Sequence, residues 1–145
     1  MTIRQAEEAD LSGLLELYTQ LHDNPLPEKS EALSALWETI LRDRSQHLIV
    51  AEEDGKIVSS CVLVIVPNLT HCQRPYALIE NVVTDSAYRK RGLAGACLAR
   101  AKELAGQNGC YKIMLLTGSK ENATLDFYRN AGYRSEDKTG FVQWL

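Results

Sequence analysis

The chain has 145 residues, with 16 Lys and Arg against 19 Asp and Glu, so its formal net charge is -3. This length fits one ordinary domain, residues 1–145, and the charge balance offers no basic field for a nucleic-acid partner. Hydrophobic residues make up 45% and charged residues 24% of the chain. These fractions exclude a disordered or fibrous protein, and the longest apolar run, 61–67, is too short to span a membrane.

The N-terminus and the cysteines indicate the compartment. Residues 1–4 lead into an acidic helical pattern without the charged and then apolar segment of a secretory signal, so we expect a soluble cytoplasmic protein. The four cysteines, at positions 61, 72, 97 and 110, include no C-x-x-C pair. In a reducing compartment such cysteines are small buried hydrophobic residues, and we predict neither disulfides nor a metal site.

The first part of the chain predicts a strand around Ile3 and then two amphipathic helices, separated by a break at residues 24–27. Asp10 is a suitable N-cap for the first helix. The apolar positions recur every three or four residues, and they are Leu11, Leu14, Leu15, Tyr18 and Leu21 in the first helix and Leu33, Leu36, Trp37, Ile40 and Leu41 in the second. This spacing gives each helix one apolar face.

Short apolar runs then predict most of a sheet. Residues 47–52 and 56–66 form a hairpin around Asp54-Gly55, and a loop at 67–75 precedes the next strand. The later elements are a strand at 76–84, a helix at 91–107 stopped by Asn108-Gly109, a strand at 110–117, a helix at 122–130, and two last strands around Tyr133 and at 141–145. This order predicts an α+β domain with a mixed sheet, in which strands 76–84 and 110–117 are parallel.

Residues 85–95 lead from a strand end through a basic, glycine-containing loop into a helix. Such a junction offers free N–H groups and the positive end of a helix dipole, and Gly92 and Gly95 allow close approach to the main chain. The segment therefore suits a pyrophosphate. The alternative is that the glycines only ease a turn and the basic run is solvated surface. It is neither a P-loop nor a Rossmann fingerprint.

Arg89-x-x-Gly92-x-Ala94 matches the R/Q-x-x-G-x-G/A acyl-CoA signature of the GNAT acetyltransferase superfamily, at the same strand-to-helix junction. In the same chain order, residues 79–83 resemble the fourth strand of that family, residues 109–113 its fifth strand, and residues 126–133 its F-Y-x-x-x-G-Y helix exit. The resemblance implies a single-domain GNAT fold, with a mostly antiparallel mixed sheet, a splayed parallel strand pair and flanking helices.

The resemblance also implies acetyl-CoA as a co-substrate. Its pyrophosphate would lie on the amides of Arg89, Lys90, Arg91, Gly92, Leu93, Ala94 and Gly95, and its pantetheine along the backbone of Asn81, Val82 and Val83. The family often has Asn seven residues before the helix tyrosine, but Glu121 occupies that position here and Asn122 follows it. Asn122 is therefore either a pantetheine contact or a helix N-cap.

Two side chains are candidates for the chemistry. Glu80 lies in an otherwise apolar strand, where an ionised carboxylate is costly unless the site uses it, so it is the candidate general base acting through water. Its alternative role is an exposed residue on an edge or splayed strand. Tyr128 occupies the position where the family uses a tyrosine, and it is the candidate acid for the departing thiolate; otherwise it is a core aromatic. A backbone N–H near Val82 would stabilise the oxyanion.

These features favour an acetyl-CoA-dependent N-acetyltransferase that acts directly on a small primary amine. The motif blocks resemble those of glucosamine-6-phosphate N-acetyltransferases, which suggests an amino sugar phosphate. A protein N-terminal or lysine acetyltransferase and a non-catalytic acyl-CoA-binding sensor are the alternatives. The apolar chain end, residues 141–145, predicts a homodimer that pairs through late strands, as the family commonly does, unless that strand is covered by its own domain.

Overall fold

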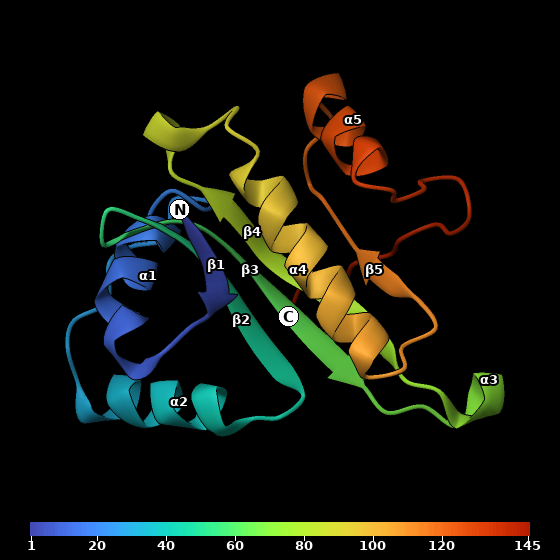
Figure 1. The fold of residues 1–145 in the computed structure, drawn as a ribbon, viewed down its shortest axis with the longest axis horizontal. Helices are drawn as coiled ribbons and strands as arrows, with labels where there is room; N and C mark the ends of the chain where they lie inside the picture. The colour runs from blue at the N-terminus through green and yellow to red at the C-terminus, as the bar shows by residue number, and fades with distance from the viewer.

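The fold is built around one five-stranded sheet with helices on both faces (Figure 1). The computed structural model describes residues 1–145. The strands lie in chain order across the sheet, and they are β1 (Thr2–Gln5), β2 (Gln46–Glu53), β3 (Lys56–Val66), β4 (Tyr76–Thr84) and β5 (Ile113–Leu115). The helices are α1 (Leu11–Tyr18), α2 (Glu31–Arg42), α3 (Thr70–Gln73), α4 (Leu93–Gln107) and α5 (Asn122–Asn130), with short 3-10 turns at Glu8–Asp10 and Ser86–Tyr88.

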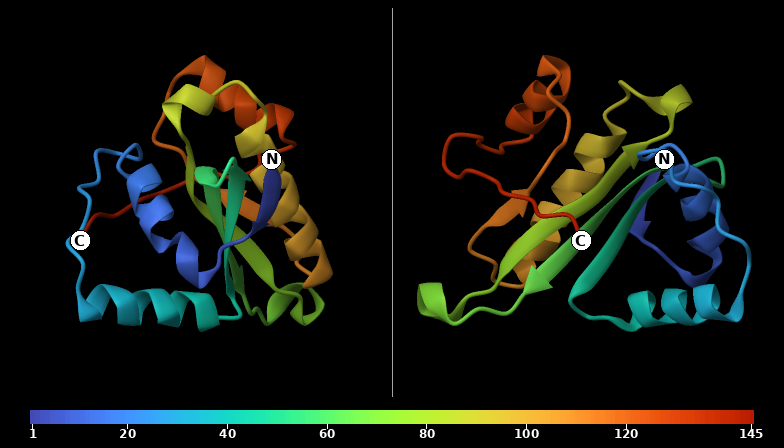
Figure 2. Two further views of the ribbon diagram at one scale, coloured as in Figure 1. Left: turned by 60° about the vertical axis from the view of Figure 1, so that its left-hand side comes forward. Right: turned by 180° about the vertical axis from the view of Figure 1, so that it is seen from behind.

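The sheet is mixed. Strands β1 to β4 pair antiparallel with their neighbours, whereas β5 pairs parallel with β4. Helix α4 joins that parallel pair and covers one face of the sheet, while α1 and α2 lie over the other face (Figure 2). The structure thus confirms the predicted α+β architecture and the parallel pair joined through a helix.

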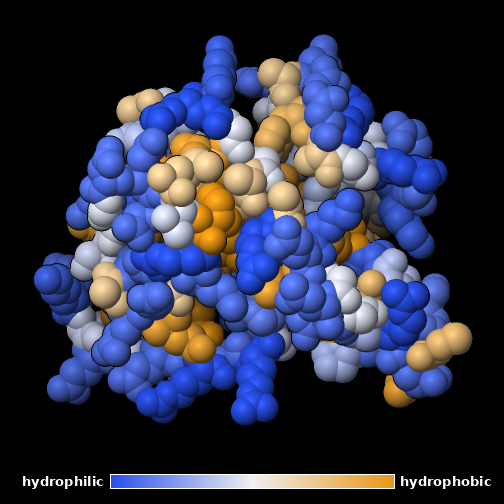
Figure 3. Space-filling view, viewed as in Figure 1, coloured by the Kyte–Doolittle hydropathy of each residue, from blue (hydrophilic) through white to orange (hydrophobic).

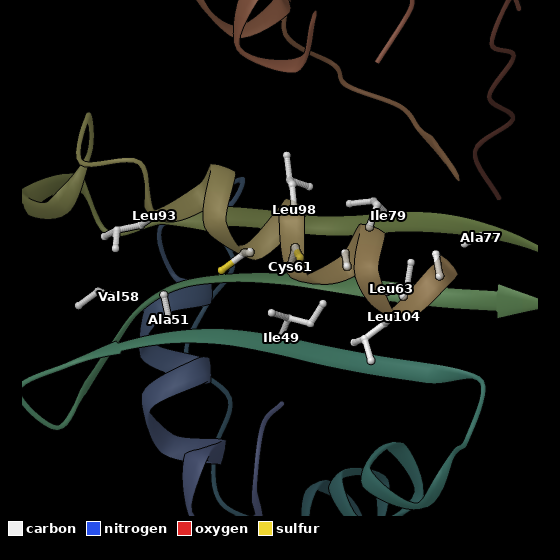
Figure 4. Packing of buried hydrophobic residues seen from close by; sticks show 13 residues of the cluster. Ile49, Ala51, Val58, Cys61, Leu63, Ala77, Ile79, Leu93, Leu98 and Leu104 are labelled. Atoms are coloured by element: carbon white, nitrogen blue, oxygen red, sulfur yellow. The ribbon is translucent and has the colours of Figure 1, made fainter. Parts of the chain in front are cut away.

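The larger core lies between α4 and the sheet (Figure 4). Every side chain that the periodicity predicts for the apolar side of α4 is buried: Leu93, Cys97, Leu98, Ala101, Leu104 and Ala105. They pack against β2, β3 and β4 through residues such as Ile49, Leu63 and Ile79. Burying one large aliphatic side chain contributes about 1.5–3 kcal/mol. This core therefore holds α4, including its N-terminal end, firmly against the sheet.

A second core lies between the sheet and helices α1 and α2, around Leu14, Leu17 and Trp37. The indole Nε1 of Trp37 donates a hydrogen bond to the backbone oxygen of Glu8 at 3.1 Å, which ties α2 to the 3-10 turn just before α1. The prediction for Leu36 was wrong, because this side chain is 56% exposed. Only a narrow stripe of α2 touches its neighbours, and Leu36 lies outside that stripe.

The surface on the α4 side is mainly hydrophilic, with apolar atoms visible in patches among the polar ones (Figure 3). None of the helices combines the length and the apolar character needed to cross a membrane.

The C-terminal segment runs behind the sheet, on the side of α1 and α2 (Figure 2).

The two predicted last strands are absent. The amide of Tyr133 donates to the backbone oxygen of Tyr128 and so closes the end of α5 instead of joining a ladder. Residues 141–145 pair with no strand, and the side chains of Phe141 and Trp144 are 90% and 89% exposed. Local apolar character favours a strand, but a strand also needs a neighbouring edge, and this chain end reaches none.

Other boundaries also differ from the prediction: β2 extends one residue further at each end than 47–52, α1 ends at Tyr18 and so leaves out Leu21, and the predicted loop 67–75 contains the short α3. Strand β5 is shorter than residues 110–117, because the amides of Cys110 and Tyr111 are bonded to the end of α4 and to Pro75. Helix α4 begins at Leu93 and not at residue 91, because Gly92 takes a left-handed conformation (φ 78°) that a right-handed helix cannot include.

Candidate active site

Strands β4 and β5 separate part-way along their length. They pair only where Ala77, Leu78 and Ile79 face Ile113 to Leu115, and β4 then continues to Thr84 without a partner on that side. The backbone N–H and C=O groups of this free edge need hydrogen-bond partners from solvent or from a ligand. The predicted pantetheine contacts, residues 81–83, lie on this edge.

The free edge contains a β-bulge. Val62 of β3 faces Glu80 of β4, and Ser60 faces Val83. One residue separates Ser60 from Val62 on β3, and it lies opposite two residues of β4, Asn81 and Val82. Asn81 has a left-handed backbone (φ 51°), which asparagine tolerates better than most residues. A bulge bends a strand and redirects its backbone groups, and bulges are common beside active sites. The side chain of Asn81 is exposed and that of Val83 is buried.

The side chain of Glu80 is exposed to solvent and makes no hydrogen bond or ion pair within the chain. Its neighbour Ile79 points into the core under α4, so Glu80 projects from the opposite face of the sheet. The argument that an ionised Glu80 would be costly in an apolar strand was therefore wrong, because water reaches the carboxylate. The position matches the alternative of an exposed residue on a splayed strand, and it leaves Glu80 able to act on a molecule that approaches this face.

The predicted pyrophosphate loop has an unusual supply of free amides. No backbone N–H of residues 89–95 donates to another backbone group of the chain. Lys90 and Gly92 both have left-handed backbones (φ 61° and 78°), which curve the segment just before α4. A Cβ built on Gly92 or Gly95 would have no atom within 4 Å, so the chain leaves this space open. Free amides at a helix N-terminus form a site for an anion.

The three basic side chains of this loop have different partners. The Nε of Arg89 donates to the backbone oxygen of Thr84 at 3.4 Å, and Lys90 is exposed without a protein partner. In contrast, Arg91 forms an ion pair with Glu53 of β2, with 2.7 Å between Nη2 and Oε1. Arg89 and Lys90 therefore remain available to a phosphate, whereas Arg91 is bound to the sheet.

Helix α5 lies at the same end of the molecule as the N-terminus of α4 (Figures 1 and 2). Its N-cap is Glu121, so the alternative prediction that Asn122 is the N-cap was wrong: Asn122 is the first helical residue. Glu121 makes no capping hydrogen bond with its side chain. Asn122 is exposed, and its amide side chain is free to meet a ligand.

Tyr128 is half-buried among aromatic side chains. Its ring meets Phe127 edge-on at 5.0 Å between centroids and Tyr133 at 6.3 Å. Burial, with a smaller contribution from Cys61, raises the pKa of the Tyr128 phenol above its usual range. The phenol therefore carries its proton at neutral pH and can donate a hydrogen bond. The ring packs against the core under α4, so the alternative role as a packing residue is also present.

Sequence reasoning missed the residues that hold the loop in place. Asp85, Lys56, Tyr88 and Glu53 form a set of contacts between the loop and the β2–β3 turn. Glu53 and Arg91 are 38 residues apart in the chain. No local pattern links such distant positions. The only signal in the sequence was the opposite charge of Glu53, beside a predicted turn, and Arg91, in a basic loop.

The comparisons with known proteins agree with this geometry. Residues 11–133 match the model of the Acetyltransferase (GNAT) family. The chain therefore belongs to the GNAT acetyltransferases, and it is an N-acetyltransferase by family. That family implies an acyl-CoA co-substrate, typically acetyl-CoA, and the free amides of residues 89–95 and the open edge of β4 fit such a molecule.

Three similar proteins illustrate the relationship. The glucosamine 6-phosphate N-acetyltransferase of Trypanosoma brucei brucei is 33% identical over 141 residues, which cover 95% of this chain and 92% of that protein. Glucosamine 6-phosphate N-acetyltransferase 1 of Oryza sativa subsp. japonica is 35% identical over 141 residues, or 90% of this chain and 79% of the relative. A solved structure from Agrobacterium tumefaciens str. C58 is 42% identical, covers 100% of both chains and has a TM-score of 0.93. The GNAT fold is thus confirmed.

Proposed function

We propose that the protein acts as one domain, residues 1–145, which transfers the acetyl group of acetyl-CoA directly to the primary amine of a small molecule. The observation that carries the proposal is that two neighbouring segments have unpaired backbone groups: the free edge of β4 and the amides of residues 89–95, with a hydrogen-bonded turn at 85–88 between them. The amides would bind the pyrophosphate, aided by Arg89 and Lys90. The backbone of Asn81, Val82 and Val83 would align the pantetheine.

The chemistry requires a protonated amine to lose two protons and the departing sulfur to gain one. Glu80 accepts the first amine proton through water, from the face of the sheet opposite α4, and the lone pair that is freed forms a C–N bond to the acetyl carbon. The C–S bond then breaks, and the nitrogen releases its second proton to water. Tyr128 holds a proton at its Oη and donates it to the sulfur as negative charge develops there. A backbone N–H of the bulge near Val82 stabilises the oxyanion.

The class of acceptor rests on the relatives. Two of them, at 33% and 35% identity, are glucosamine 6-phosphate N-acetyltransferases, which supports an amino sugar phosphate as the first acceptor to test. A protein N-terminus or lysine is the alternative acceptor, and an acyl-CoA-binding sensor without turnover is the non-catalytic alternative. The cytoplasmic location also stays a prediction.

Release of free thiol from acetyl-CoA tests these alternatives directly. The acceptors are glucosamine 6-phosphate, glucosamine, other small amines and amines on peptides, each at the same concentration. We expect turnover with small amines and the highest rate with the phosphorylated amino sugar. Turnover with peptides alone would contradict a small-molecule acceptor. Binding of acetyl-CoA without turnover of any acceptor would favour the sensor.

We predict that Glu80→Gln lowers turnover more at neutral pH than at high pH. A solvent-deprotonated amine no longer needs a base, so the gap between variant and wild type should narrow as pH rises. The measurement is the ratio of the two initial rates across this pH range. Because Glu80 is exposed and has no protein partner, the variant should fold normally. A constant ratio would leave Glu80 without a role as base.

We also predict a homodimer formed through the C-terminal segment. Phe141 and Trp144 are almost fully exposed, and Gly140 beside them lies against Leu116, which is itself 62% exposed just after β5. Apolar groups gathered in this way favour contact with another protein surface. Light scattering at micromolar concentration should give twice the mass of one chain. Phe141→Ser with Trp144→Ser should give a monomer, whereas Leu69→Ser, at another exposed leucine, should not. A monomeric wild type would refute the prediction.

A further inference from the structure

Arg91 belongs to the acyl-CoA signature loop, but its guanidinium is turned toward the sheet. Its Nη2 lies 2.7 Å from Oε1 of Glu53, the last residue of β2. The side chain of Glu53 is only 21% exposed, and its other oxygen, Oε2, is buried without any hydrogen-bond partner. A partly buried carboxylate with one cationic partner is costly to leave unpaired. If Arg91 moved to a phosphate, it would leave Glu53 as an unpaired, partly buried carboxylate, and this opposes the movement.

A second contact holds Arg91 in the same place. The Cζ of Arg91 lies 5.2 Å from the centre of the Tyr88 ring, and the Nζ of Lys56 lies 5.3 Å from the same ring. A cation at this distance from an aromatic ring is attracted to the electron-rich face. The Tyr88 ring thus contacts two cations, one from its own loop and one from the start of β3.

Lys56 and Asp85 complete the connection. The Nζ of Lys56 lies 2.7 Å from Oδ2 of Asp85, whose side chain is 8% exposed. The other carboxylate oxygen of Asp85 accepts a hydrogen bond from the amide of Ala87 at 2.9 Å, and its backbone oxygen accepts one from the amide of Tyr88 at 2.8 Å. Asp85 therefore sets the turn that begins the loop and binds it to the start of β3.

Both ends of the loop are in this way tied to the same hairpin. Asp85 is held by Lys56 on one side of the Asp54-Gly55 turn, and Arg91 is held by Glu53 on the other side. Between these ties lie Arg89 and Lys90, and the free amides extend from Arg89 into α4. The hairpin supplies no group to the anion site, but it limits the shapes that the loop can take.

We propose that Glu53 and Arg91 are positioning residues, and that the β2–β3 turn keeps the loop in the shape that presents its free amides to the pyrophosphate of acyl-CoA. This inference rests on the acetyl-CoA site proposed above. It leaves the backbone amide of Arg91 among the predicted phosphate contacts and gives the guanidinium a structural partner instead of a phosphate. An ordered loop has less conformational entropy to lose on binding, so the tie improves affinity without touching the ligand.

Glu53→Gln separates a positioning role of Arg91 from direct contact with phosphate. The two roles predict opposite changes in the affinity for acetyl-CoA. If Arg91 binds phosphate, or acts on it through its charge alone, removal of the nearby carboxylate leaves the affinity unchanged or increases it. If the tie positions the loop, the same change loosens the loop and weakens binding. We expect calorimetry to show an approximately tenfold rise in the Kd of acetyl-CoA for Glu53→Gln. At saturating acetyl-CoA the turnover number should stay near that of the wild type, so the loss appears in KM.

A reciprocal exchange provides a second test that does not depend on one substitution. Arg91→Glu alone places two carboxylates together and should weaken binding strongly. Combining it with Glu53→Arg restores an ion pair of reversed polarity and should recover most of the lost affinity. Glu103→Gln is the matched control, because it breaks the exposed Arg100–Glu103 pair on α4, 2.9 Å long, away from the loop. This control should bind acetyl-CoA like the wild type.

The possible failures are distinguishable. A wild-type protein that does not bind acetyl-CoA would contradict the proposed function itself. A wild type that binds, together with Glu53→Gln that binds equally well or more tightly, would overturn the positioning role and leave the proposed function intact. If circular dichroism shows that Glu53→Gln does not fold, the charge exchange is the deciding test. A double variant that binds acetyl-CoA no more tightly than Arg91→Glu alone would overturn the inference.

Discussion

Gly92→Asp is expected to lower the affinity for acetyl-CoA by at least about a hundredfold, with the fold retained. The new carboxylate would lie among the free amides of residues 89–95, at the start of α4, and would repel the pyrophosphate. It would also occupy space that the chain leaves open around Gly92. Titration calorimetry with acetyl-CoA measures the loss, and circular dichroism checks the fold.

Gly109→Asp is the matched control for this experiment. Gly109 has almost the same left-handed backbone as Gly92, with φ 74° against 78°, and a Cβ there also meets no atom within 4 Å. The strain of the substitution is therefore similar, but Gly109 lies just after the C-terminal end of α4. We expect this variant to bind acetyl-CoA like the wild type. Equal binding by Gly92→Asp and wild type would show that the anion site lies elsewhere.

Tyr128→Phe is expected to lose roughly a hundred- to ten-thousandfold in the rate of the chemical step, the range that general-acid catalysis usually contributes. Burial raises the pKa of the phenol, which stays protonated at neutral pH, and none of the side-chain hydrogen bonds of the chain involves its hydroxyl. Removing that oxygen therefore costs little stability and leaves the ring contact with Phe127 intact. Single-turnover measurements with saturating acetyl-CoA report the chemical step directly.

Two controls distinguish an acid from a packing residue. Tyr133→Phe removes the neighbouring phenol, whose pKa burial raises to about 12, and should keep the wild-type rate. An acyl donor with a more acidic thiol should shrink the defect of Tyr128→Phe, because a better leaving group needs less protonation. A wild-type single-turnover rate in Tyr128→Phe would mean that water supplies the proton and that Tyr128 only packs.

Local patterns in the sequence determined most of the secondary structure. Strands 56–66 and 76–84 and the helix 122–130 have the predicted bounds, and all six predicted apolar positions of α4 are buried. These features depend on side-chain periodicity and on turn residues, which act over a few positions. The Arg89–Ala94 motif could likewise be read without a structure, because the loop and helix it requires are contiguous in the chain.

Only the tertiary structure decided what surrounds those elements. The bulge at Asn81 arises from pairing between β3 and β4, and the free edge of β4 after Ile79 depends on where β5 leaves β4. The tie between Arg91 and Glu53 joins positions 38 residues apart. The apolar residues 141–145 were predicted as a strand, but no edge of the sheet meets them. Periodicity describes which face of an element is apolar, whereas pairing, exposure and ion pairs depend on which distant segment packs beside it.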